Sequence, residues 1–232
     1  VGLNTQQFSS LSTASIKALS TLQIRVLTSA QLNSLGSAHI AAIETTDINA
    51  LTTAQVSTLS TTQIVGLSTA QVAALSTGQV AALTSVQINA LASDDLKALT
   101  TTQVRALTSD QLSKLSSDQI ALMATDDIAA LSTGQISHLS TSAIAALTTA
   151  QAKALTTASI NALTSAQVTA IETADLAAMS TAQLSKLGTA QVAQLTSVQV
   201  AALTSGQVKS LNSDQVAALT SAQLNALTSS QL

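Results

Sequence analysis

The sequence lacks cysteine and proline altogether, and it has no tryptophan, no tyrosine and a single phenylalanine. Without cysteine the chain can form no disulfide, no thiolate nucleophile and no cysteine-ligated metal centre. Without tryptophan or tyrosine it offers almost no aromatic surface on which nucleic-acid bases could stack. The sequence therefore excludes disulfide, thiolate and cysteine-ligated metal chemistry, and it disfavours nucleic-acid binding.

Charge and long hydrophobic runs are also scarce. Only 8% of residues are charged, and the eight basic residues are scattered, so no phosphate-binding stripe exists. The longest apolar runs have about five residues, as in Ala143 to Leu147, whereas a membrane-spanning helix needs ~20. We therefore expect no nucleic-acid partner and no membrane insertion.

What the sequence does contain is an octapeptide, typified by Leu67 to Ala74, that repeats without insertion or deletion. Every eighth residue from Leu3 gives one series of 29 positions. Every eighth residue from Gln7 gives a second series, in which 21 of 29 positions are Gln. The leucine series has only four exceptions, namely Ile43, Met123, Ile171 and Met179. Such a short period is typical of a solenoid or array. We therefore expect residues 1–232 to form a single continuous solenoid of 29 repeats, part of a longer array or fibre.

Each octapeptide carries the signals that start a helix. Ser68 is a favourable N-cap, because its hydroxyl can accept a hydrogen bond from a first-turn N–H. Gln71, three residues later, can reach back to the backbone of the cap and complete a capping box. Leu67 and Val72 flank this box at the positions of a hydrophobic staple. Leu75 then closes the helix and opens the next staple.

Two other folds compete with a series of short helices. In one long helix eight residues advance ~800°, so the leucines would drift ~80° per repeat and define no constant face. A β-solenoid remains an alternative, although Leu67 and Val72 are five residues apart and one strand would send them to opposite faces. Alanine and glutamine also favour helix over strand.

The short-helix interpretation requires the repeats to stack. A helix of six or seven residues is unstable alone, because isolated helices below ~12 residues are marginal. Stacking of neighbours into a continuous core supplies the missing stability. The sequence therefore predicts an all-α solenoid, with one short capped helix per octapeptide and the leucines and valines inside. Small residues such as Ala73, Ala81 and Asn89 should cover the outer face.

Four unusual repeats bear on the number of octapeptides per coil. In these repeats the glutamine is replaced by Asp47, Asp95, Asp127 and Asp175, and the cap by Glu44, Ala92, Ala124 and Glu172. A carboxylate in the first turn favours a helix N-terminus and can offset a lost cap. The aspartates are 48, 32 and 48 residues apart, all multiples of 16, which predicts two octapeptides per coil.

Few residues are candidates for chemistry. His39 and His138 are 99 residues apart and occupy different positions of the repeat, so surface substitution explains them better than a shared metal site. Asp94–Asp95 and Asp126–Asp127 could hold calcium, but compensation of charge at a helix start is the simpler interpretation. The abundant Ser and Thr have no paired base. We predict no catalytic, cofactor-binding or metal-binding residue, and no enzymatic activity.

The pattern L-[ST]-[ST]-x-Q-[VI]-x-A, seen at Leu67 to Ala74, resembles the octapeptide tracts of large bacterial surface and secreted proteins. The resemblance covers the whole chain. It implies a structural module of a surface protein or extracellular filament, such as a spacer, adhesin stalk or fibre that assembles by stacking. The helix starts also resemble those of transcription-activator-like effector repeats, but the longer repeat and its base-reading loop are absent, so DNA recognition is not implied.

These features lead to two hypotheses of function. The first is the extracellular or cell-surface structural module, whose partners are other copies of the chain or adjoining repeats of a longer one. The alternative is a surface-binding module that presents its regular Ser, Thr and Gln rows to a glycan, ice or a protein ligand. Substitutions are scattered rather than concentrated on one face, which favours the structural role.

Overall fold

The computed structural model describes residues 2–231, and within this range the only regular secondary structure is helical. It contains 28 α-helices of four to six residues and no strand among the described residues. The all-α prediction is confirmed, and the β-solenoid alternative is wrong. The helices are slightly shorter than the predicted six or seven residues, because the closing leucine of each repeat lies in the link.

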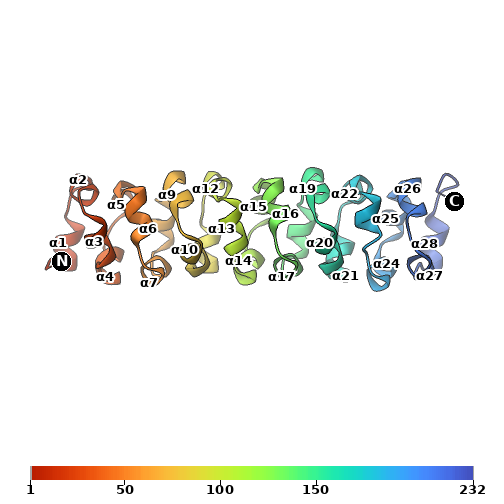
Figure 1. Cartoon of the computed structure of the whole chain (residues 1–232), viewed down its shortest axis with the longest axis horizontal. Coiled ribbons are helices and arrows are strands. Elements are labelled where there is room, and N and C mark those ends of the chain that lie inside the picture. Colours follow the sequence, from red (N-terminus) through yellow and green to blue (C-terminus); the bar gives the residue numbers. More distant parts are fainter. Residues whose placement is uncertain (1, 232) are drawn as a thin grey trace. The chain divides into compact units, whose positions relative to one another are not determined.

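The helices fall into two compact units, Val1–Lys114 and Leu115–Leu232. The first unit contains α1 (Thr5–Ser9), α2 (Thr13–Lys17), α3 (Thr21–Arg25), α4 (Ser29–Asn33), α5 (Ser37–Ala42), α6 (Thr45–Ala50), α7 (Thr53–Ser57), α8 (Thr61–Val65), α9 (Thr69–Ala74), α10 (Thr77–Ala82), α11 (Ser85–Asn89), α12 (Ser93–Ala98), α13 (Thr101–Ala106) and α14 (Ser109–Ser113). The second contains α15 (Ser117–Leu122), α16 (Thr125–Ala130), α17 (Thr133–Ser137), α18 (Thr141–Ala145), α19 (Thr149–Ala154), α20 (Thr157–Ala162), α21 (Ser165–Ala170), α22 (Thr173–Ala178), α23 (Thr181–Leu184), α24 (Thr189–Gln194), α25 (Ser197–Ala202), α26 (Ser205–Lys209), α27 (Ser213–Ala217) and α28 (Ser221–Ala226). In each unit the ribbon winds through short helices joined by extended links (Figure 1).

The predicted helix start is present in α9. The Ser68 hydroxyl accepts from the Gln71 N–H at 3.3 Å, and the Gln71 Oε1 accepts from the Ser68 N–H at 2.8 Å. Together these bonds form the capping box. At the other end Leu75 has extended backbone angles and its N–H donates to the Val72 carbonyl at 3.2 Å. The helix therefore ends at the residue that the repeat predicts.

Three octapeptides, not two, complete one coil. In the first unit α7 contacts α10, and α10 contacts α13; in the second α16 contacts α19, and α19 contacts α22. One coil is therefore 24 residues long, and the predicted period of 16 is wrong. The aspartate spacing of 48 residues equals two coils, but the spacing of 32 is not a whole number of coils. Because the octapeptides of one coil share one consensus, the sequence shows the period of eight and conceals the longer one.

The core consists of the two aliphatic series of the repeat. Leu67 and Val72 are 6% and 0% exposed, and the equivalent side chains are buried in all but the end coils. Ala73, Ala81 and Asn89 are exposed, as predicted. With about two large aliphatics per helix, each coil depends on the coils above and below it for a closed core.

Gly66 lies at a close approach between two coils. It caps the C-terminus of α8, at a position where most repeats have alanine, and it lies against the start of α5. A Cβ at this position would stand 2.6 Å from the Cβ of Ser37 and 2.9 Å from its backbone Cα and O. An alanine there would force the two backbones apart.

We therefore predict that Gly66→Ala destabilises the protein by about 1–3 kcal/mol, the usual cost of overpacking. The matched control is Gly78→Ala in α10, where an added Cβ meets only Thr53 Cγ2 at 3.9 Å. The control should be neutral or stabilising by up to about 1 kcal/mol, because alanine has a higher helix propensity than glycine. Urea unfolding of both variants measures the difference, and equal effects would contradict the close approach.

Candidate functional site

The most distinctive constellation in the chain is the glutamine at the start of each helix, which is bonded at both ends. In α9 the Gln71 side chain is 2% exposed. Its Oε1 accepts from the N-cap, as described above. Its Nε2 donates to the carbonyls of Ile40 at 2.9 Å and Ile43 at 2.6 Å, where α5 ends in the preceding coil. One carboxamide thus joins the start of one helix to the end of another.

The same linkage recurs through both units and forms what we call the glutamine ladder. In each case Nε2 reaches the carbonyls 31 and 28 residues earlier. The glutamines that make both bonds are 55, 63, 71, 79, 87, 103 and 111 in the first unit and 151, 167, 183, 191, 199, 207, 215, 223 and 231 in the second.

The ladder satisfies a requirement that short helices create. The last carbonyls of any helix have no partner within the helix, and a buried carbonyl without a partner is costly. Here the neighbouring coil supplies the missing donor. The capping box predicted the role of Oε1 from the sequence alone, but the role of Nε2 was missed, because its partners lie about one coil away.

His39 replaces glutamine in α5 and performs the same two functions. The Gly36 N–H donates to its Nδ1 at 3.3 Å, and its Nε2 lies 2.9 Å from the carbonyl of Leu11. A carbonyl can only accept, so Nε2 carries the proton. Predicted as a surface substitution, His39 is instead half-buried and joins two coils.

His138 is exposed and follows the last residue of α17. Its ring lies beside the hydroxyl of Ser137, so the two side chains have to be considered as a base and a nucleophile. Its Nδ1 is 3.4 Å from Ser137 Oγ but 2.7 Å from the carbonyl of Gly134. Because the carbonyl requires a donor, Nδ1 carries the proton and cannot act as a base for Ser137. No group of three His, Asp or Glu side chains that could hold a metal ion occurs within the described range.

The aspartates that replace glutamine are bonded differently. A carboxylate cannot donate to the free carbonyls, so it accepts instead. The Thr21 hydroxyl donates to Asp47 at 2.6 Å, and the Thr149 hydroxyl donates to Asp175 at 2.7 Å. In both pairs the threonine begins the helix one coil earlier. These bonds keep adjacent coils joined, and they supply a reason for the aspartates beyond compensation of helix charge.

Of the two carboxylate pairs considered for calcium, Asp94–Asp95 is the better defined. The Asp94 side chain is exposed, and its Oδ1 lies 3.8 Å from Nζ of Lys97. The Asp95 side chain is buried. Burial raises the pKa of the Asp95 carboxyl above its ordinary value of 3.8; a hydrogen bond from the Ala92 backbone lowers the pKa, and the charge of Asp94 raises it. The two carboxylates therefore have different environments, one solvated and one in the interior.

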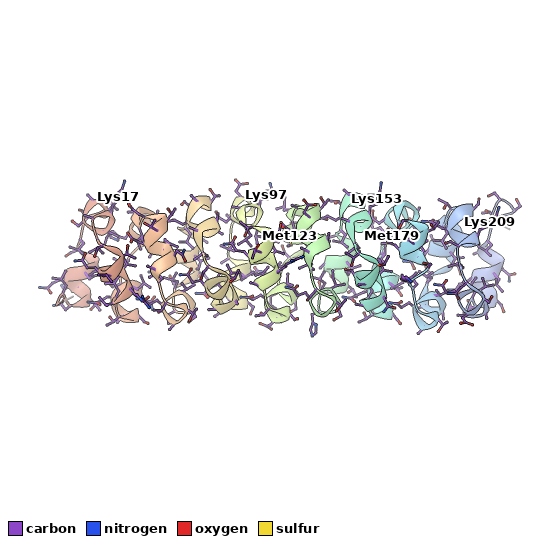
Figure 2. All side chains as sticks on the ribbon, viewed as in Figure 1. Lys17, Lys97, Met123, Lys153, Met179 and Lys209 are labelled. Atoms are coloured by element: carbon purple, nitrogen blue, oxygen red, sulfur yellow. The ribbon has the colours of Figure 1, made fainter. Side chains whose placement is uncertain are left out.

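The outer surface carries hydroxyls, alanines and few charges. The residue after the cap is Ser or Thr in all 29 repeats, begins each of the 28 helices, and is exposed or half-buried throughout the described chain. Lys17 and Lys97 in the first unit project away from the ribbon, as do Lys153 and Lys209 in the second (Figure 2). In contrast Met123 and Met179 occupy leucine positions and are buried.

The glutamine ladder predicts a large effect of Gln71→Glu. Glutamate can keep the capping box but loses both Nε2 donors and places a charge opposite two carbonyls. We expect a loss of about 2–4 kcal/mol of unfolding free energy. The same change at the exposed Gln194 should stay within about 0.5 kcal/mol. Chemical denaturation distinguishes them, and a similar small loss at both positions would argue against the ladder.

Asp95 leads to a pH-dependent prediction. Because its pKa is raised by folding, its ionised form destabilises the fold, and this penalty disappears as pH falls below about 4. Asp95→Gln should therefore stabilise the chain by about 1 kcal/mol or more at pH 7, and by less at pH 3.5. The exposed Asp118→Gln is the control. Melting temperatures at both pH values test this, and a gain that is larger at pH 3.5 would refute it.

Comparison with known proteins agrees with the repeat architecture. The ALTTAQ repeat family matches residues 1–39, 40–77, 65–93, 88–125, 120–157, 168–205 and 199–229, which together cover most of the chain. No curated protein was found to match. No helix in the described part of the chain is long and apolar enough to cross a membrane. The chain belongs to the ALTTAQ repeat family.

Proposed function

We propose that this chain is a structural spacer, whose role is to hold whatever is attached to it at a fixed separation. The observation that supports this role is the glutamine ladder. Its buried carboxamides join successive coils by the same two hydrogen bonds, repeat after repeat. A module joined in this way gains length by adding coils, and each new coil is fixed to the one before it.

The distribution of polar side chains also supports a non-catalytic role. Several polar groups that could perform chemistry are engaged in structural bonds, namely those of His39, Asp47 and Asp175. A reaction site usually breaks local regularity. In this chain the irregular repeats of His39, Asp47 and Asp175 maintain the links between coils instead.

We further propose that the spacer belongs to a bacterial surface protein or extracellular filament, and that its partners are other copies or adjoining repeats. The octapeptide resembles the tracts of such proteins. The composition suits this setting, because eight Lys and Arg residues and one aromatic residue leave few cleavage sites for common proteases. Absence of cysteine makes the fold insensitive to the redox state of its surroundings.

A surface-binding module is the second candidate. The observation that favours it is the Ser or Thr that follows the cap in all 29 repeats, since this side chain is exposed or half-buried throughout the described residues. The glutamine row cannot contribute to such a surface, because its side chains are mostly buried. Any ligand would therefore contact the hydroxyl rows.

The spacer proposal predicts that distances scale with the number of coils. Cysteines introduced at Lys17 and Lys97 would carry spin labels on one unit of a chain that has no other cysteine. Deleting residues 52–75 removes one complete coil between the labels. The distance between the labels should then shorten by the length of one coil, and the distribution of distances should remain narrow. Pulsed electron–electron double resonance measures both quantities.

Two outcomes would contradict this proposal. A broad distribution in the parent would show that the unit is not rigid enough to set a distance. An unchanged distance after the deletion would show that coils do not add length.

The surface location needs a separate test. An epitope inserted at the exposed Asn89 should be labelled by its antibody on intact cells of the native organism.

A further inference from the structure

We propose that the chain binds a calcium ion at Asp95, where the carboxylate and the backbone carbonyls of Ile64, Val65 and Leu67 supply the oxygen ligands. This position belongs to the glutamine ladder, but aspartate stands there in place of glutamine. Most of the ligands are backbone oxygens, so the site needs no cluster of three acidic or histidine side chains. It lies within the first unit and does not depend on the spacer function.

In the ladder, three carbonyl oxygens converge on one point. Nε2 of Gln103 lies 2.9, 3.3 and 2.8 Å from the carbonyl oxygens of Val72, Ala73 and Leu75. Gln87 makes the same three contacts with its own carbonyls, at 3.0, 3.3 and 2.6 Å. These two glutamines belong to the repeats directly after and directly before that of the aspartate. The convergence is therefore a regular property of the helix ends on both sides of the proposed site.

At Asp95 the equivalent carbonyls are those of Ile64, Val65 and Leu67, the residues 31, 30 and 28 positions earlier. They lie at the end of α8 and in the link to α9, and α12, which carries the aspartate, packs on α9. No side chain of the described residues donates to these three carbonyls. A carboxylate has no N–H to offer them, unlike a carboxamide. The rung thus brings oxygen atoms together without a side-chain donor, which favours a cation between them.

The Asp95 carboxylate is buried beside uncharged helices. Its side chain is 4% exposed, and α8 and α9 contain no charged residue. Lys97 projects away from the ribbon, where its Nζ lies 3.8 Å from the exposed Asp94 (Figure 2). Burial raises the pKa of the Asp95 carboxyl, although a hydrogen bond from the Ala92 backbone lowers it, and the charge of Asp94 raises it further. A bound cation would offset the cost of burying this charge.

Asp95 also differs from the other aspartates in its hydrogen bonds. The Thr21 hydroxyl donates to Asp47 at 2.6 Å, and the aspartate of α22 is bonded in the same way. The equivalent hydroxyl for Asp95 is that of Thr69, and no hydrogen bond joins these two side chains in the described chain. The Asp95 carboxylate therefore keeps the capacity for coordination that a hydroxyl takes up elsewhere.

The distribution of acidic residues favours an ion of charge two. Eight of the eleven acidic residues lie in the four repeats that have aspartate at the glutamine position, two in each repeat. In the remaining repeats acidic residues occur singly. Two neighbouring carboxylates repel each other, so their association at these four repeats is best explained by a divalent cation. The four pairs are Glu44 with Asp47, Asp94 with Asp95, Asp126 with Asp127, and Glu172 with Asp175.

The kind and spacing of the ligands match calcium better than magnesium. Calcium takes about six to eight oxygens from carboxylates, backbone carbonyls and water, at about 2.3–2.6 Å. Magnesium requires a near-ideal octahedron at about 2.0–2.1 Å. In the flanking rungs the carbonyl oxygens lie 2.6–3.3 Å from Nε2, so they need to move less for the larger ion. Water from the surface beside Val65, which is 57% exposed, would complete the coordination shell.

The test compares the parent chain with Asp95→Gln, in which the residue found in 21 of 29 repeats replaces the proposed ligand. Isothermal titration of the chelator-treated proteins with calcium chloride should show that the variant binds one calcium ion fewer than the parent. We expect a Kd of about 0.1–1 mM for this ion, and binding of magnesium chloride at the same site at least about tenfold weaker.

The matched control is Asp110→Gln, which removes the same charge from an exposed position of the same unit. The control should bind as many calcium ions as the parent. Thermal unfolding gives a second measurement: calcium chloride at about 10 mM should raise the melting temperature of parent and control by at least about 3 °C, and that of Asp95→Gln by less. Sodium chloride of equal ionic strength should not reproduce the difference.

Three results would overturn the proposal. The first is equal calcium binding by the parent and Asp95→Gln, and the second is the same loss of binding in the control. The third is a parent whose melting temperature does not respond to calcium although Asp95→Gln is more stable than the parent at pH 7. That combination would show that the buried carboxyl is accommodated by a proton, not by a metal ion.

Discussion

The free carbonyl groups at the ends of short helices are the constraint on which this structure depends. A helix of five or six residues has about as many unpaired backbone groups as paired ones, so a stack of such helices would bury many polar atoms without partners. Gln71 shows how the chain meets this demand. Its carboxamide accepts at the start of its own helix and donates at the end of another, and no buried side-chain polar atom among the described residues lacks a partner.

The replacements of glutamine show which property matters. His39 preserves both functions, because an imidazole, like a carboxamide, has one accepting and one donating atom on opposite sides. Asp47 has only accepting atoms, and its link to the preceding coil is supplied by the hydroxyl of Thr21 instead. In these replacements the bond between coils is kept, and the chemistry of the side chain decides which backbone or hydroxyl group takes part. The position also contains Ser15, Ser159 and Ala143, which have no carboxamide, so the bond is not required at every repeat.

Much of this architecture could be predicted from local sequence, because capping boxes and staples act within eight residues. Ser68, Gln71 and Leu75 have the predicted roles, and the two aliphatic series form the core. The number of octapeptides per coil could not be predicted, since it depends on the angle between successive helices and the sequence of one coil carries no internal mark. The second bond of Gln71 was missed for the same reason: without the coil length, Ile40 and Ile43 are not its neighbours. The close approach of Gly66 to the start of α5 depends on the same packing.

The period of three helices per coil has a consequence for how such a chain can change. A gain or loss of one octapeptide preserves every capping box and leaves a glutamine available at every helix start. It also turns everything that follows by one third of a coil. Residues that shared a row with a given side chain before the event would then lie in a different row, while the interior remained the same. Slippage within the coding repeat can therefore rearrange the outer surface of the protein in steps of about 120°, with the core and its hydrogen bonds conserved at each step.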